Sequence, residues 1–211
     1  MLEVRDLSFS YRRGGEELFG GLTHTFTHGA VTAVAGASGR GKSTLLYILG
    51  LLLRPSRGVV AIDGLCGSDL TDLARSNLRA LHIGFVFQDA ALDPSRTILD
   101  AIIEPALYSG SNCSKTTSRA LDLLAQLGVQ HRASHRPGQI SGGQAQRVAV
   151  CRALINDPAI VLADEPTGNL DRENAETVLD ELRRAAGAGT TVVIATHDPF
   201  VIDRADEVLA L

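Results

Sequence analysis

Four short apolar runs divide the chain: VTAVAG at residues 31–36, IGFVF at 83–87, AIVLADE at 159–165 and TVVIATH at 191–197. Nearly continuous apolar character over so few residues is typical of parallel strands that are covered on both faces. Near the start, LEVRDLSFSY alternates between apolar and polar positions, and the RRGGEE turn follows it. This segment predicts an antiparallel hairpin. The pattern therefore predicts an α/β fold with a largely parallel core sheet and an antiparallel N-terminal edge sheet.

A helical segment interrupts the run of predicted strands. Residues from about 89 to 140 contain no convincing strand, and TSRALDLLAQLG repeats apolar residues at helical spacing. That spacing places Leu121, Leu124, Ala125 and Gly128 on one predicted face. We expect a single domain over residues 1–211, with a helical subdomain at about 89–157 inserted in its core.

Composition narrows the class of protein. The chain has 211 residues, 45% of them hydrophobic, which is enough for one substantial core. A net charge of -4 argues against nucleic acid as a partner, because nucleic-acid-binding domains are usually strongly basic. Three widely spaced cysteines suggest neither a disulfide framework nor a zinc site. The first residues lack the features of a signal peptide, and the longest apolar run has nine residues, so we expect the chain not to cross a membrane.

The stretch AGASGRGKST contains a motif that binds phosphate. Gly36, Gly41, Lys42 and Ser43 fit the pattern GxxxxGK[ST], between a predicted strand and a predicted helix. Glycines allow backbone N–H groups to surround an anion, and the start of the helix adds the positive end of its dipole. Lys42 would contact the β and γ phosphates and Ser43 would bind Mg²⁺. The alternative is an ordinary glycine-rich turn that caps a helix.

Two acidic residues end the third apolar run. Asp164 and Glu165 follow a predicted buried strand, at the edge where open α/β sheets bind ligands. Asp164 is placed to orient Mg²⁺ and Glu165 to act as a general base on an attacking water. The alternative is that both residues cap the next helix.

The stretch ISGGQAQRVAVCRAL begins a third predicted helix. Ser141 and Gln144 fit a capping box, and Val148, Cys151 and Leu154 supply an apolar stripe. Gly142 and Gly143 directly after the cap are unfavourable for a helix, by up to about 1 kcal/mol each relative to alanine. Exposed N–H groups that accept a phosphate would explain them.

The order of these motifs carries a family resemblance. GASGRGKST, FVFQ, ISGGQ, VLADEPTGNLD and ATHD together resemble the ATP-binding subunit of an ABC transporter, over essentially the whole chain. The wording of RPGQISGGQAQRVAVCRAL and LADEPTGNLD is most similar to the MacB/LolD export branch. Arg40 and Cys151 depart from it, because a small residue and alanine are usual at these positions.

The resemblance implies an ATP hydrolase that uses ATP and Mg²⁺ and works as a head-to-tail dimer. It also implies an integral membrane permease as partner, a place at the cytoplasmic face of the cell membrane, and export or extraction of a lipoprotein, macrolide, haem or peptide. A soluble ABC ATPase that assists iron-sulfur assembly is the alternative.

The resemblance also assigns site residues. It implies catalytic roles for Lys42, Gln88, Glu165 and His197, and Mg²⁺ contacts for Ser43, Gln88 and Asp164. Each of three residues has a simpler alternative: Tyr11 as an edge-strand aromatic, Gln88 as a loop amide and His197 as a core histidine. The implied nucleotide-binding residues are Tyr11, Gly36, Ala37, Ser38, Gly39, Arg40, Gly41, Lys42, Ser43, Thr44, Ser141, Gly142, Gly143, Gln144 and Asp171.

A surface for the membrane partner is expected along residues 88 to 110. There the apolar residues would either line a groove for a short helix of the permease or fill the core of the helical segment. These residues are Phe87, Leu92, Ile98, Leu99 and Ile102.

Overall fold

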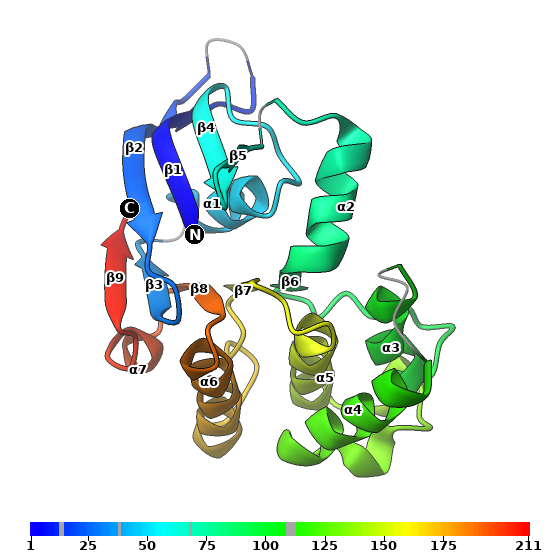
Figure 1. The fold of residues 1–211 in the computed structure, drawn as a ribbon. Coiled ribbons are helices and arrows are strands. Elements are labelled where there is room, and N and C mark those ends of the chain that lie inside the picture. The colour runs from blue at the N-terminus through cyan, green and yellow to red at the C-terminus, as the bar shows by residue number, and fades with distance from the viewer. Residues whose placement is uncertain (13–14, 38, 68, 109–112) are drawn as a thin grey trace.

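The core sheet contains five strands in the order β6-β7-β8-β3-β9, and every neighbouring pair is parallel. Figure 1 shows this sheet in a computed structural model that describes residues 1–12, 15–37, 39–67, 69–108 and 113–211. Each of the four apolar runs contains one strand, so the predicted parallel sheet is confirmed. The strands are β3 (Val31–Ala35), β6 (Ile83–Val86), β7 (Ile160–Asp164), β8 (Thr191–Thr196) and β9 (Glu207–Ala210).

A second, antiparallel sheet has the order β2-β1-β4-β5. Its hairpin of β1 and β2 is the predicted one, with Val4 opposite His24, whereas β4 and β5 were not predicted. Val4 also lies opposite Val60 of β4, which makes β1 a central strand. The strands are β1 (Leu2–Phe9), β2 (Leu18–Phe26), β4 (Arg57–Ile62) and β5 (Leu65–Cys66).

Helix α1 (Lys42–Leu49) lies between the two sheets. Leu45, Leu46, Ile48 and Leu49 are fully buried, and they pack against apolar side chains of both sheets. The helix ends at Leu49 with Gly50 as its C-cap, and Leu51 has a left-handed φ of 57°, so the helix stops earlier than the apolar sequence suggests. Contact with both sheets fixes where α1 begins, and therefore where the phosphate-binding motif lies.

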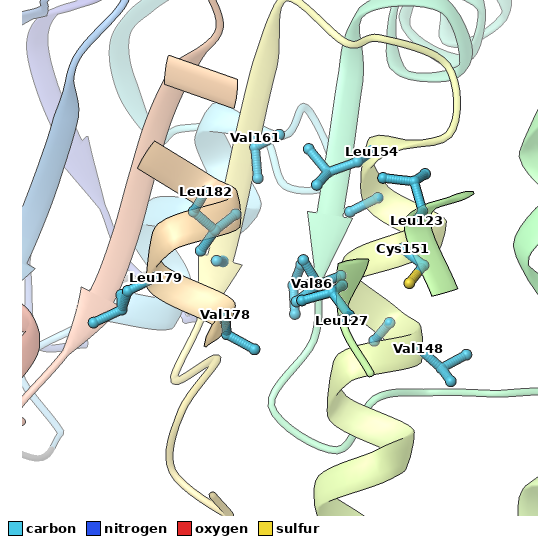
Figure 2. Packing of buried hydrophobic residues seen from close by; sticks show 14 of the residues in the cluster. Val86, Leu123, Leu127, Val148, Cys151, Leu154, Val161, Val178, Leu179 and Leu182 are labelled. Carbon is cyan, nitrogen blue, oxygen red and sulfur yellow. The ribbon is translucent and has the colours of Figure 1, made fainter. Parts of the chain in front are cut away.

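The other face of the core sheet is covered by α5 (Gly142–Leu154) and α6 (Arg172–Gly187). Figure 2 shows their side chains meeting those of β6 and β7, with Cys151 of α5 among leucines and valines. Cys151 is fully buried, and burial raises the pKa of its thiol. The cysteine therefore serves as a small apolar side chain in place of the usual alanine.

Helices α3 (Ile98–Tyr108) and α4 (Cys113–Gln126) pack with α5 to form a helical layer beside the sheet (Figure 1). The buried face of α4 contains Ala120, Leu123 and Leu124, and Leu127 continues it just past the end of the helix. Leu124 and the partly buried Leu121 face the core as predicted, whereas Ala125 and Gly128 are exposed. The division into a core and a helical subdomain at about 89–157 stays a prediction. The remaining helical elements are α2 (Asp72–His82), α7 (Pro199–Ile202) and two 3₁₀ turns, Gln130–Arg132 and Pro137–Gln139.

Within the described residues, every helix is too short or too polar to cross a membrane.

Candidate functional site

The loop between β3 and α1 is curled around the ammonium group of Lys42. Lys42 Nζ donates to the carbonyl oxygen of Gly36 at 2.8 Å and to that of Ala37 at 3.3 Å, and the residue is only 9% exposed. Gly39 and Gly41 have φ values of 82° and 92°, which glycine adopts without strain. Ser38 lies outside the described residues.

A contact from β2 keeps this loop in place. A Cβ atom on Gly41 would lie 3.1 Å from Leu18 Cδ1 and 3.2 Å from the ring of Phe19. Gly41 is therefore needed both for its φ and for the close approach of β2. Leu18 also lines the cavity at this loop, and the sequence motifs gave no sign of it.

One cavity of about 670 Å³ collects most of the predicted site residues. It opens above the start of α1, where the loops after β3, β6, β7 and β8 meet. Gly36 and Arg40 belong to the same loop but do not line the cavity. The lining residues are Tyr11, Leu18, Ala37, Gly39, Gly41, Lys42, Ser43, Thr44, Gln88, Asp164, Glu165 and His197.

Asp164 ends β7 at the floor of this cavity and is 2% exposed. Burial raises the pKa of Asp164 above its ordinary value, a hydrogen bond from Ser43 lowers it, and the charge of Glu165 raises it. A buried carboxylate without a full complement of donors favours a cation nearby. Ser43 and Glu165, which influence the Asp164 carboxyl, carry oxygen atoms, and Lys42 supplies a positive charge.

Glu165 is held by three contacts with β8 and the loop after it. Its backbone N–H donates to the carbonyl oxygen of Ala195 at 2.9 Å, while Thr196 Oγ1 donates to Oε2 at 3.1 Å. Oε1 lies 2.6 Å from Nδ1 of His197. Glu165 has a left-handed φ of 45°, a strained value for this residue type and one that is common at functional sites. His197 is exposed, so the alternative of a core histidine is wrong.

Two side chains of α5 position the loop after β6, which carries Gln88. Gln146 Nε2 donates to the carbonyl oxygen of Phe87 at 3.2 Å, and Arg152 donates to those of Ala91 and Ala90 at 2.7 and 2.8 Å. Ala90 and Ala91 have left-handed φ values of 60° and 45°, which are strained for alanine. Arg152 therefore holds a strained turn directly beyond Gln88, and sequence reasoning missed this residue.

Tyr11 lies across the mouth of the cavity. Its hydroxyl is 2.7 Å from Thr44 Oγ1, and its ring packs edge-on against Phe9 with centroids 4.8 Å apart. Tyr11 is 68% exposed, so one face of the ring is available to a flat ligand.

The residues of the ISGGQ stretch lie outside this cavity. The predicted capping box is present: Ser141 Oγ accepts from the backbone N–H of Gln144, and Gln144 Oε1 accepts from that of Ser141. A Cβ atom on Gly143 would lie 3.0 Å from Leu170, whereas one on Gly142 would meet nothing within 4 Å. The fold of this chain therefore explains Gly143 and leaves Gly142 unexplained.

Asp171 also lies outside the cavity, as the N-cap of α6. Its carboxylate accepts hydrogen bonds from the backbone and side chain of Asn174, chiefly the backbone one, and these lower its pKa.

Comparisons with known proteins agree with this geometry. A sequence profile of the ABC transporter family matches residues 19–168. The lipoprotein-releasing system ATP-binding protein LolD of Paramagnetospirillum magneticum is 42% identical, over 100% of this chain and 94% of that protein. The macrolide export ATP-binding/permease protein MacB of Rhodopseudomonas palustris is 47% identical over 90% of this chain, which spans 29% of that longer protein. The solved dimer of the ATP-binding cassette MJ0796 bound to ADP and Pi has a TM-score of 0.93 at 34% identity, covering 100% of this chain and 94% of that one.

Proposed function

The chain belongs to the ABC transporter family and hydrolyses ATP, and from this premise we propose that it powers a membrane permease of the lipoprotein-releasing or macrolide-exporting kind. The permease would hold it at the cytoplasmic face of the membrane. The relatives are named as transporter subunits, which favours transport over iron-sulfur assembly. The observation that carries the proposal is the single cavity where Lys42, Gln88, Asp164, Glu165 and His197 meet.

In this proposal the loop at Lys42 holds the phosphates of ATP. The Lys42 ammonium now donates to two carbonyl oxygens of its own loop, and phosphate oxygens would be better acceptors because they are charged. The unpaired backbone N–H groups at the start of α1 would add donors, as is usual where a helix begins at a phosphate. Tyr11 would stack on the adenine base, and its hydrogen bond to Thr44 would be replaced as the nucleotide enters.

The residues below the phosphates fit a magnesium ion. Ser43, Gln88 and Asp164 offer oxygen atoms, the ligand type that Mg²⁺ prefers, and burial of Asp164 favours a neighbouring cation. No group of three or more His, Cys, Asp or Glu side chains able to hold a metal occurs among the described residues, so phosphate and water would complete the coordination. When bound, the ion neutralises charge on the phosphates.

Glu165 is placed to accept a proton from the attacking water. Its two oxygens are fixed by Thr196 and His197, so the carboxylate has a defined direction before ATP binds. As the O–P bond to the leaving ADP breaks, Lys42 stabilises the negative charge on the phosphate oxygens. Gln88, which lines the same cavity, would help orient the water.

A second copy of the chain would complete the site. Ser141, Gly142, Gly143, Gln144 and Asp171 lie outside the cavity of their own subunit, and the open space over Gly142 suits an approaching phosphate. The relative MJ0796 is a dimer in its solved structure with ADP and Pi. In a head-to-tail pair, the ISGGQ stretch of each subunit would face the cavity of the other.

Of the five apolar residues expected to contact the permease, Phe87, Leu92 and Leu99 are only partly buried. Ile98 and Ile102 are fully buried, so they fill the helical core. A separate groove of about 210 Å³ lies between β6, α2, α3 and α5, and Tyr108 lines it with 73% of its surface exposed. We propose that a short cytoplasmic helix of the permease docks there. The groove also contains Arg79, Ala80, Ile83, Gly84, Phe85, Glu104, Pro105, Arg152, Ala153, Asn156 and Pro158.

Site-directed photocrosslinking in the source cell tests this function. A crosslinking residue at Tyr108 should capture one integral membrane protein, whereas the same residue at exposed Val208, on the edge strand β9 farthest from β6, should not. The captured protein, purified and reconstituted in liposomes, should stimulate ATP hydrolysis by the wild-type chain. Capture from both positions, or from neither, would contradict the proposal.

A further inference from the structure

Two guanidinium groups enclose the ring of Phe200. The Cζ atoms of Arg172 and Arg204 each lie 3.7 Å from the centroid of that ring. Two groups so close to one centroid cannot share a face without overlapping, so they occupy opposite faces. Such contacts are attractive because the faces of an aromatic ring carry negative partial charge. Phe200 is 8% exposed as a result, although α7 is a single turn.

The stack joins the start of α6 to the segment that follows His197. Arg172 is the first residue of α6, directly after Asp171, and its Nη1 also lies 4.0 Å from Oδ2 of Asp198. On the other face, Arg204 Nη2 lies 3.7 Å from Oε1 of Glu176, in the second turn of α6. Residues 198–204 are therefore fastened to α6 at two points.

The helix itself does not explain Arg172. A cation in the first turn of a helix opposes the positive end of the helix dipole, and acidic residues are preferred there. Asp171 and Glu173 already meet that preference on either side. The Arg172 side chain is 62% exposed, so it does not fill the core either. Its contacts with Phe200 and Asp198 therefore explain why an arginine occupies this position.

Asp198 and Phe200 closely follow Thr196 and His197, which hold the proposed base, Glu165. The backbone N–H of Asp198 donates to Thr196 Oγ1 at 3.1 Å, and the same hydroxyl donates to Glu165 at 3.1 Å. His197, between them, contacts the other oxygen of Glu165. A shift of Asp198 would therefore move both contacts that orient the Glu165 carboxylate.

We propose that Arg172 is a positioning residue, which acts through Phe200 and Asp198 to hold His197 and Thr196 in register with Glu165. The inference rests on the proposed role of Glu165 in hydrolysis. It connects the turn at Asp171, which would face the second subunit, with the residues that direct the attacking water.

Steady-state ATP hydrolysis by the purified full chain tests this role. Arg172→Ala should lower kcat about fivefold and leave KM for ATP within about twofold, because a loss near 1 kcal/mol of positioning corresponds to that ratio and no nucleotide contact is removed. Arg172→Lys, which keeps the cation, should recover part of the rate. Arg183→Ala, an exposed arginine on the same helix, is the matched control and should hydrolyse ATP at the wild-type rate.

A double-mutant cycle with Phe200→Leu separates positioning from stability. In that background Arg172→Ala should lower kcat clearly less than fivefold, because the ring contact is gone and only the contact with Asp198 is left to lose. An unchanged kcat for Arg172→Ala, or a full fivefold loss in the Phe200→Leu background, would overturn the proposal. So would a fall in Tm without a fall in kcat. Undiminished hydrolysis by Glu165→Gln would instead contradict the proposed function on which it rests.

Discussion

Nδ1 of His197 lies 2.6 Å from Oε1 of Glu165. A carboxylate can only accept, so Nδ1 carries the hydrogen, and Nε2 of the neutral ring is an acceptor. Both residues line the cavity that contains Lys42. The contact therefore fixes the direction of the Glu165 carboxylate within the cavity proposed to hold the phosphates.

Replacing Glu165 by glutamine tests the base directly. Glu165→Gln keeps the shape of the side chain but cannot accept the proton of the attacking water, so hydrolysis should fall at least about 100-fold. Calorimetry should show ATP binding within a few-fold of wild type, and size-exclusion chromatography with ATP should show a stable dimer. Phosphate release at the wild-type rate would remove Glu165 from the mechanism.

The chain has two lysines, so Lys115 can serve as the control when the phosphate contact of Lys42 is tested. Eighteen of the twenty basic residues are arginine, yet the loop uses Lys42, whose compact ammonium fits between the carbonyl oxygens of Gly36 and Ala37. Lys42→Ala should weaken ATP binding at least about tenfold, since charge-assisted hydrogen bonds contribute about 1.5–3 kcal/mol. Lys42→Arg should not restore it, because the larger guanidinium does not fit.

Lys115→Ala, on the exposed surface of α4, should bind ATP as the wild type does. Equal affinity of the Lys42 and Lys115 variants by calorimetry would show that the loop does not hold the phosphates.

Gly142 and Gly187 both lie in helices with nothing within 4 Å of an added Cβ. Replacing either by alanine should therefore leave the monomer as stable or raise its stability by up to about 1 kcal/mol. Only Gly142→Ala should impair ATP-dependent dimer formation, measured by light scattering, because its methyl group would occupy the space we assign to the phosphate of the other subunit. The same dimer yield for both variants would argue against that space being an interface.

Asp164 should make the fold less stable as pH rises. Its pKa is raised in the folded protein, chiefly by burial, so the folded form binds the proton more tightly than the unfolded chain does. The free energy of unfolding should therefore fall as pH rises through the ordinary aspartate range up to the raised value. Asp164→Asn should raise Tm at pH 7, because the neutral amide removes the cost of burying the charge.

The gain from Asp164→Asn should shrink as pH falls below the raised pKa of Asp164, where the wild-type carboxyl is protonated as well. ATP hydrolysis by this variant should be lost. A gain in Tm that does not change with pH would mean that the charge of Asp164 is not its cause.

A stability prediction concerns the contact between β6 and α5. A Cβ atom on Gly84 would lie 2.1 Å from the carbonyl oxygen of Ala153, so the strand and helix would have to separate. Gly84→Ala should lower the free energy of unfolding by about 2 kcal/mol or more in urea denaturation. Gly138→Ala, where an added Cβ meets nothing within 4 Å, should have almost no effect. Similar midpoints for the two variants would contradict this packing.

The sheet was predictable where the sequence is apolar on both sides of the strand. β3, β7 and β8 are buried almost throughout, and β6 contains only buried or partly buried residues, so their runs stand out. β9 alternates between partly buried and exposed residues at an edge, and β5 has two residues, so neither produces a clear pattern. The buried face of α4 was misjudged because Ala120 and Leu127, not Ala125 and Gly128, continue its apolar stripe.

The site was predictable where a residue lies next to a motif in the sequence. Lys42, Asp164, Glu165 and His197 line one cavity, as their motifs indicated. Arg152 was missed, because it contacts the loop after Gln88 across about 60 residues of chain. Leu18 was missed for a similar reason: it reaches Gly41 from a strand whose pairing only the fold determines.

The adjacent glycines at 142 and 143 are constrained by different neighbours. A larger residue at 143 would press on Leu170 of the same chain, whereas under the proposed pairing only another molecule opposes one at 142. A descendant that came to work alone would therefore be free to change residue 142 while keeping residue 143. A related sequence that keeps glycine at 143 but has a larger residue at 142 would therefore indicate that its dimer had been lost.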